Sequence, residues 1–216
     1  NVAVNLNETV AIFSLEMGAE SLVERIICSH ASINAGHLKT GKLTPEEYTQ
    51  YFVATGALSE APIFIDDTPG IRVAEIRAKC RRLKQERNNL GLVVIDYLQL
   101  IEGNGKESRQ QEVSEISRNL KKLAKELKVP VIALSQLSRG VEQRQDKRPI
   151  MSDIRESGSI EQDADIVAFL YRDDYYRQEP DENGHVPEVE PNSTIEVIIE
   201  KNRSGPRGTV ELNFMK

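Results

Sequence analysis

Three polar side chains follow apolar runs of the chain, and their types suit the chemistry of a phosphate group. They are Glu16, Asp96 and Gln136. A glutamate can draw a proton from water as a general base, and an aspartate can hold Mg²⁺ or its waters. A neutral amide can hydrogen-bond both a phosphate oxygen and an attacking water. Together the three types match the separate tasks of nucleotide hydrolysis.

Each of these residues also has a plainer interpretation. Asp96 could be an ordinary aspartate in the loop after a strand. Glu16 could be a carboxylate that favours the dipole of the helix that follows it. Gln136 could be a simple loop amide. The residue types alone leave both interpretations open.

The runs before these side chains predict buried strands of a parallel sheet. Four are expected, at residues 9–14, 62–67, 91–96 and 131–135. They are rich in β-branched residues and continuously apolar, which is typical of strands covered on both faces. Ligand chemistry gathers at the carboxyl ends of parallel strands, so Glu16, Asp96 and Gln136 are expected at one edge.

Helices are expected between these strands, at residues 19–32, 44–58, 68–83 and 113–127. Thr44-Pro45-Glu46-Glu47 is a capping box with proline at the first helical position. The helix at 68–83 carries many basic residues; we favour a solvated outer face over a phosphate-binding patch. The alternation of strands and helices indicates an α/β fold.

Residues 138–152 are polar and basic and show no pattern, so we expect a mobile, functional loop. A short helical piece should follow at 160–165 and a strand at 166–170. Residues 173–192 are acidic and contain several prolines, which predicts an exposed insertion.

Two alternating strands are expected at residues 194–200 and 209–214. The turn between them should direct Lys201 and Arg203 outward. Such cations usually only solubilise a hairpin, but rigidly held ones could reach the phosphates of a neighbouring subunit.

The composition fits one large soluble domain, cytoplasmic and without a membrane span. Cys28, Cys80 and the three histidines lack the spacing of metal ligands, so a metal or disulfide framework is not expected. The net charge of −6 argues only slightly against a nucleic-acid partner. The binding surface could be confined to a few loops or to the lumen of an oligomer.

Five strings of the chain, in this order, resemble the C-terminal ATPase domain of the bacterial replicative helicases of the DnaB family. They are SLEM at 14–17, VIDYLQL at 94–100, LSQLSR at 134–139, RESGSIEQDAD at 155–165 and KNRSGP at 201–206. The resemblance implies a RecA-like P-loop NTPase core, with a mostly parallel central sheet flanked by helices and a C-terminal antiparallel hairpin. It also implies a homohexameric ring that moves along single-stranded DNA, with ATP and Mg²⁺ as cofactors.

The resemblance also assigns roles. Glu16 would be the catalytic base, Asp96 the Mg²⁺ carboxylate and Gln136 the γ-phosphate sensor. Lys201 and Arg203 would act in trans on the neighbouring subunit's nucleotide. DNA-backbone contacts would come from a loop that contains Arg155, Glu156 and Gly158. Primase and a helicase loader would be the protein partners, at the replication fork.

The sequence departs from the family pattern in one respect. The phosphate-binding loop G-x-x-x-x-G-K-[ST] is absent from residues 1–216, and the resemblance implies that it lies before Asn1 together with an N-terminal helical domain. We therefore expect a single truncated ATPase domain over residues 1–216 that binds and hydrolyses ATP poorly by itself.

Two other classes stay open at this point. A RecA-like recombinase or clock-type ATPase would share the core, although the strings at 155–165 and 201–206 favour the helicase. A non-catalytic fragment that binds a loader or primase could retain Glu16 and Asp96 without using them.

Overall fold

The computed structural model describes residues 1–103, 105, 108–154, 157–178 and 192–215, and the chain forms two compact units. The first unit is Asn1–Ser135 and the second is Gln136–Lys216. The assignment of residues 1–216 to one ATPase domain stays a prediction.

The first unit is built on a four-stranded parallel sheet in the order β2-β1-β3-β4. Its strands are β1 (Thr9–Ser14), β2 (Ile63–Asp66), β3 (Leu90–Asp96) and β4 (Val131–Ala133). Every pairing is parallel, so all four strands end at the same edge. The four predicted strands are confirmed, although β4 ends two residues earlier than expected.

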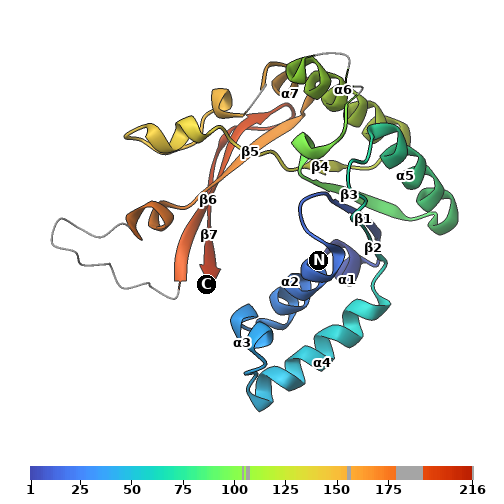
Figure 1. The fold of residues 1–216 in the computed structure, drawn as a ribbon, viewed down its shortest axis with the longest axis vertical. Helices are drawn as coiled ribbons and strands as arrows, with labels where there is room; N and C mark the ends of the chain where they lie inside the picture. The colour runs from blue at the N-terminus through green and yellow to red at the C-terminus, as the bar shows by residue number, and fades with distance from the viewer. Residues whose placement is uncertain (104, 106–107, 155–156, 179–191, 216) are drawn as a thin grey trace. The chain divides into compact units, whose positions relative to one another are not determined.

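Six α-helices and one 3₁₀-helix accompany this sheet in the described residues of the first unit. They are α1 (Val2–Leu6), α2 (Ala19–Ala31), α3 (Ala35–Thr40), α4 (Pro45–Glu60), α5 (Val73–Arg87), η1 (Leu98–Leu100) and α6 (Arg109–Leu127). Figure 1 shows α5 and α6 beside each other against the sheet, and α2, α3 and α4 as a separate group of helices. No helix in the described part of the chain is long and apolar enough to cross a membrane.

The helix α6 shows why these segments are helical. Its large apolar residues recur at intervals of three and four and are buried: Val113, Ile116, Leu120, Leu123 and Leu127. On α5, Ile76 and Cys80 face the same core and are fully buried. The core of the first unit therefore lies between this helix pair and the sheet.

The basic side of α5 is solvated as predicted, with Arg81, Arg82 and Arg87 exposed, but part of its charge is paired. Arg77 and Arg81 both donate hydrogen bonds to the Glu126 carboxylate of α6. The bond from Arg81, with a smaller contribution from Arg77, holds the pKa of Glu126 below its ordinary value. Part of this charge therefore joins two helices.

The helix α5 also begins at Val73, later than the predicted Thr68. The backbone N–H of Thr68 instead donates to the Asp66 side chain at 3.1 Å, and Gly70 has a φ of +65°. Both features belong to a turn, which competes with helix formation.

The second unit contains a three-stranded antiparallel sheet in the order β5-β6-β7. Its elements are η2 (Arg139–Gln143), η3 (Met151–Asp153), α7 (Ser157–Asp163), β5 (Ile166–Tyr171), η4 (Asp173–Gln178), β6 (Asn192–Asn202) and β7 (Gly208–Met215). Val167 and Phe169 point to one face of β5 and pack with Ile154 in a small core. A parallel sheet followed by an antiparallel hairpin confirms the predicted fold class.

Residues 138–152 have local structure that the sequence did not predict. They contain η2 and most of η3, and the Arg144 guanidinium donates to both carboxylate oxygens of Asp153, at 2.7 and 3.1 Å. Asp153 is only 6% exposed. This ion pair joins residues nine positions apart within the segment. The mobility and function expected of residues 138–152 stay predictions.

The predicted acidic insertion at 173–192 is only partly described. Its first six residues form η4, where Asp173 is half-buried and accepts a hydrogen bond from the Tyr171 hydroxyl at 2.9 Å. Asp173 is thus only partly exposed, while Tyr175 of the same element is exposed, and the exposed insertion stays a prediction. Residues 179–191 lie outside the described residues.

Candidate active site

Glu16 and Asp96 lie at the carboxyl edge of the parallel sheet. The strands β1 and β3 pair so that Ser14 is opposite Asp96. The backbone N–H of Leu15 then donates to the Asp96 carbonyl oxygen at 2.7 Å. Glu16 is the next residue, so the strand ends hold the two carboxylate-bearing residues side by side. The predicted meeting of these residues at one edge is confirmed.

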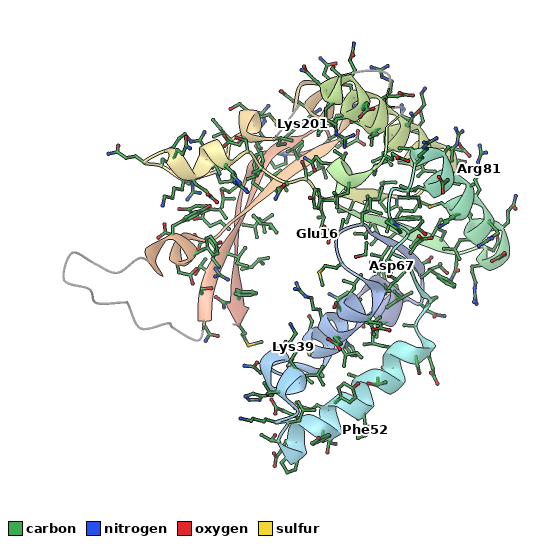
Figure 2. The ribbon with its side chains drawn as sticks, viewed as in Figure 1. Glu16, Lys39, Phe52, Asp67, Arg81 and Lys201 are labelled. Atoms are coloured by element: carbon green, nitrogen blue, oxygen red, sulfur yellow. The ribbon has the colours of Figure 1, made fainter. Side chains whose placement is uncertain are left out.

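The turn that carries Glu16 is fixed by contacts on both sides. The Ser14 hydroxyl donates to the Met17 carbonyl oxygen at 2.7 Å and closes the turn. The backbone N–H of Ala19, the first residue of α2, donates to the Asp67 carboxylate at 2.9 Å. Figure 2 shows Glu16 and Asp67 near the start of α2. The Glu16 side chain itself is exposed.

Asp67 is a residue that the sequence analysis missed. The N-cap position of α2 is Gly18, which has no side chain to accept a hydrogen bond. Asp67, which follows β2, supplies this acceptor from a different part of the chain. No local pattern could reveal this contact, because 48 residues separate the two partners.

The carboxylates at this edge differ in their partners. Partial burial would raise the pKa of Asp66, but hydrogen bonds from Lys79 and Thr68 outweigh it and lower that pKa. Asp66 is thus already neutralised by the Lys79 ammonium. Among the described residues, the Asp96 carboxylate has no such cation partner, and it is half-buried. Asp96 is therefore available to a cation, as are the exposed Glu16 and Asp67, for which the described residues supply no cation partner either.

This donor set fits Mg²⁺ and not a metal held by protein ligands alone. In the described part of the chain, no cluster of three or more His, Cys, Asp or Glu residues could hold a metal ion. Mg²⁺ bound with a nucleotide commonly takes one or two carboxylates, with phosphates and waters completing its ligands. An available aspartate at the end of a strand, such as Asp96, matches that need.

Gln136 lies three residues beyond Ala133, the last residue of β4. The β4 segment is joined to β3 by a hydrogen bond from the Leu134 N–H to the Ile95 carbonyl oxygen at 2.9 Å. The Gln99 amide then donates to the Ser135 hydroxyl at 2.7 Å. Gln136 is the next residue along the chain and the first of the second unit.

The sequence predicted that Lys201 and Arg203 project outward from the hairpin turn. In the structure both side chains instead donate hydrogen bonds to α7. Lys201 is still within β6, and its ammonium donates to the carbonyl oxygen of Glu161. The Arg203 guanidinium donates to the carbonyl oxygen of Gln162 at 3.0 Å. Figure 2 shows Lys201 beside α7. The prediction of an outward direction was wrong, because these cations bind the end of a helix that is distant in sequence.

The predicted DNA-binding residues are described only in part. Arg155 and Glu156 lie outside the described residues. Gly158 lies in the first turn of α7 and is exposed.

A family model described as "DnaB-like helicase C terminal domain" matches residues 1–216. The chain belongs to this family. It is 67% identical over 218 residues to the replicative DNA helicase DnaB of Geobacillus stearothermophilus, covering 100% of this chain and 46% of that protein. It is 66% identical over 218 residues to the replicative DNA helicase DnaC of Bacillus subtilis (strain 168), with the same coverage.

Two solved structures are also similar to this DnaB-like domain. One is a DnaB-like replicative helicase described with its interactions with primase, with a TM-score of 0.89 and 46% identity over 99% of this chain and 50% of that chain. The other is an isolated ATPase domain, with a TM-score of 0.86 and 46% identity over 96% of this chain and 72% of that chain. The chain spans about half the length of the curated relatives it matches.

One segment of this DnaB-like domain approaches the phosphate-loop pattern without matching it. Gly36, Gly41 and Lys42 have the spacing of that pattern, but Leu43 replaces its serine or threonine. Gly36 lies inside the helix α3, and Gly41 is the C-cap of that helix. A phosphate-binding loop must instead present free backbone N–H groups between a strand and a helix, so this segment cannot serve as one.

Proposed function

We propose that this chain is the motor domain of an ATP-dependent replicative DNA helicase. The observation that carries the proposal is the hydrogen bond from Leu15 to the Asp96 carbonyl oxygen, which holds Glu16 next to Asp96 in a chain of the DnaB-like family. A base and a metal carboxylate at one strand edge are the minimum that nucleotide hydrolysis requires of this unit.

The nucleotide would be ATP bound with Mg²⁺. When bound, Mg²⁺ supplies positive charge that offsets the charge on the phosphates. Asp96 would hold the ion, because its carboxylate lies half-buried at the end of β3 and has no cation partner among the described residues. Glu16 would orient the attacking water and accept its proton, and its exposure leaves it accessible to that water.

Gln136 would sense the γ-phosphate by hydrogen bonding, and Lys201 and Arg203 would contact the neighbouring subunit's nucleotide. Cations supplied in trans stabilise the charge of the transition state in phosphoryl transfer. The role in trans requires a neighbouring copy in a head-to-tail interface, and we propose that these interfaces close into a homohexameric ring.

Single-stranded DNA would be bound by the loop that contains Arg155, Glu156 and Gly158. An arginine and backbone N–H groups recognise the sugar-phosphate chain without reading its sequence. Such a contact inside a ring would explain how a chain with a net charge of −6 binds a polyanion.

Primase and a helicase loader would be the protein partners of the assembled helicase. Support for primase comes from the similar DnaB-like helicase that was solved with its interactions with primase. Both partners would meet the helicase at the replication fork, in the bacterial cytoplasm.

The substitution Glu16→Gln tests the proposal in a protein of the relatives' length that carries this chain. We expect ATP binding to be retained and steady-state turnover to fall by about a thousandfold, since the amide cannot accept the proton. Glu20→Gln is the matched control, because Glu20 is an exposed glutamate in the first turn of α2. Full turnover by the Glu16→Gln protein would reject the assignment of the base.

A further inference from the structure

The carboxyl end of α7 is the meeting point of the two cations proposed to act in trans. The last four carbonyl groups of an α-helix lack partners within the helix and carry partial negative charge. In α7, the Ile160 carbonyl accepts from the Ala164 N–H at 3.0 Å. The next two carbonyls, of Glu161 and Gln162, accept from Lys201 and Arg203. The Lys201 and Arg203 side chains are therefore held by two backbone carbonyl groups that have no partner within the helix.

Arg203 has a second point of attachment just beyond this helix. Its backbone N–H donates to the Asp165 carbonyl oxygen at 2.8 Å. Its guanidinium also lies 3.5 Å from the Asp165 carboxylate. Asp165 thus contacts both ends of the arginine, and the Gln162 carbonyl contacts the guanidinium from another direction at 3.0 Å. Two contacts therefore hold the guanidinium, and a third holds the backbone of the same residue.

The contact with the Asp165 carboxylate contributes little to folding. The side chains of Arg203 and Asp165 are 53% and 58% exposed. An ion pair between such exposed groups is screened by water and salt and has almost no effect on stability. Its main physical consequence is to restrict the rotamers of a long, flexible side chain.

We propose that Asp165 is a positioning residue that orients the Arg203 guanidinium for its contact with the neighbouring subunit's nucleotide phosphates. The proposal rests on the trans role of Arg203 in the proposed function. In this role Asp165 acts through Arg203: its carbonyl oxygen fixes the backbone and its carboxylate directs the guanidinium. A preoriented cation loses less conformational freedom when it meets the transition state, so more of its interaction lowers the barrier.

The sign of the change in kcat distinguishes a positioning carboxylate from an inhibitory one. A carboxylate that retained the guanidinium away from the phosphates would inhibit hydrolysis, and its neutralisation would raise kcat. A positioning carboxylate predicts a lower kcat instead.

The experiment compares ATP turnover by four forms of a protein of the relatives' length that carries this chain, assembled on single-stranded DNA. They are the unmodified protein, Asp165→Asn, Arg203→Ala and the double variant. We expect kcat to fall by about tenfold for Asp165→Asn, with KM for ATP changed less than about twofold. Arg203→Ala should lower kcat by about a thousandfold. A radiolabelled-ATP assay is sensitive enough for the slow variants.

The double variant separates positioning from a general structural effect. If Asp165 acts through Arg203 alone, the double variant has the same kcat as Arg203→Ala, because nothing is left to orient. A further tenfold loss in the double variant would overturn the inference, and so would an unchanged or raised kcat for Asp165→Asn. If Arg203→Ala itself left kcat unchanged, the trans role in the proposed function would fail, and the positioning role with it.

Asp163→Asn is the matched control. It removes the same charge two residues away, and among the described residues Asp163 makes no ion pair with Arg203. Its kcat should stay within about twofold of the unmodified protein, in the range expected of a surface substitution. Thermal unfolding of both aspartate variants should match that of the unmodified protein, which excludes misfolding as the cause of a lower kcat. A tenfold fall in kcat for Asp163→Asn as well would overturn the specific role of Asp165.

Discussion

Glu16 is held in place by atoms other than its own. Its exposed side chain projects from a turn whose geometry is set by Ser14, by the Asp96 carbonyl and by the amino end of α2. The contact between Ala19 and Asp67 fixes that helix end. The position of the proposed base therefore depends on a side chain that follows a different strand.

Replacing Asp67 should show this dependence. Asp67→Ala removes the only side-chain acceptor that the described residues supply to the first N–H groups of α2, and we expect the free energy of unfolding to fall by about 1 kcal/mol. Urea denaturation of the 216-residue chain measures this change. Asp67→Asn keeps an oxygen acceptor and should retain most of the stability. Equal losses in both variants would contradict a capping role.

The sequence could predict the meeting of Glu16 and Asp96, because strand order and direction alone bring strand ends to one edge. It could not predict the direction of Lys201 and Arg203. Their partners are backbone carbonyls of α7, about 40 residues away, and a carbonyl group carries no signature in the sequence. Site residues fixed by topology were thus predictable, and those fixed by a particular tertiary contact were not.

At the scale of elements, α4 shows a local pattern that specifies its own structure. The Thr44 hydroxyl accepts from the Glu47 N–H at 3.2 Å, and the Glu47 carboxylate accepts from the Thr44 N–H at 2.8 Å. We expect Thr44→Ala to lower the free energy of unfolding by about 1 kcal/mol, since it leaves a helix-end N–H without its acceptor. Chemical denaturation measures the loss. Thr49→Ala, inside the same helix, should cost far less, because alanine has the higher helix propensity.

The same cap should respond to acid. The bond from the Thr44 N–H, followed by the one from His37, holds the pKa of Glu47 below its ordinary value of 4.5. A lowered pKa means that the stabilisation is complete above pH 4.5 and is lost as the pH falls through the lower value of the folded chain. The helical circular dichroism signal at about 222 nm should decline in this pH range. Glu47→Gln should remove the part of the decline that comes from protonation of Glu47. Glu46→Gln is the control and should keep the acid profile of the unmodified chain. If Glu47→Gln also kept that profile, the acid response would not come from Glu47.

The local structures that the sequence did not predict share one cause. A capping box or a three-four apolar stripe is complete within a few turns, so α4 and α6 could be predicted. The order within residues 138–152 depends on an ion pair between Arg144 and Asp153, and the late start of α5 depends on a turn made by Asp66 and Gly70. In residues 138–152 and at the start of α5, a specific side-chain contact affects the conformation. The average composition of a segment does not reveal such a contact.

At the scale of the whole molecule, charge limits what the chain can bind by itself. The candidate edge of the first unit presents two carboxylate side chains, Glu16 and Asp96. A triphosphate is negatively charged, so its binding requires compensating cations and backbone N–H donors. The described cations Lys201 and Arg203 bind the end of α7 and are proposed to serve a neighbouring subunit.

We therefore expect the 216-residue chain, purified alone, to hydrolyse ATP at least about a hundredfold more slowly than a protein of the relatives' length that carries it. The phosphate-binding loop is absent from these 216 residues, and the near match at residues 36–42 belongs to a helix and its cap. Losing two charge-assisted hydrogen bonds to the phosphates, at ~1.5–3 kcal/mol each, is enough for this difference. Steady-state turnover with Mg²⁺ and ATP measures it, and the Glu16→Gln form of the longer protein gives the background. Comparable turnover by both proteins would mean that another group in this chain binds the phosphates.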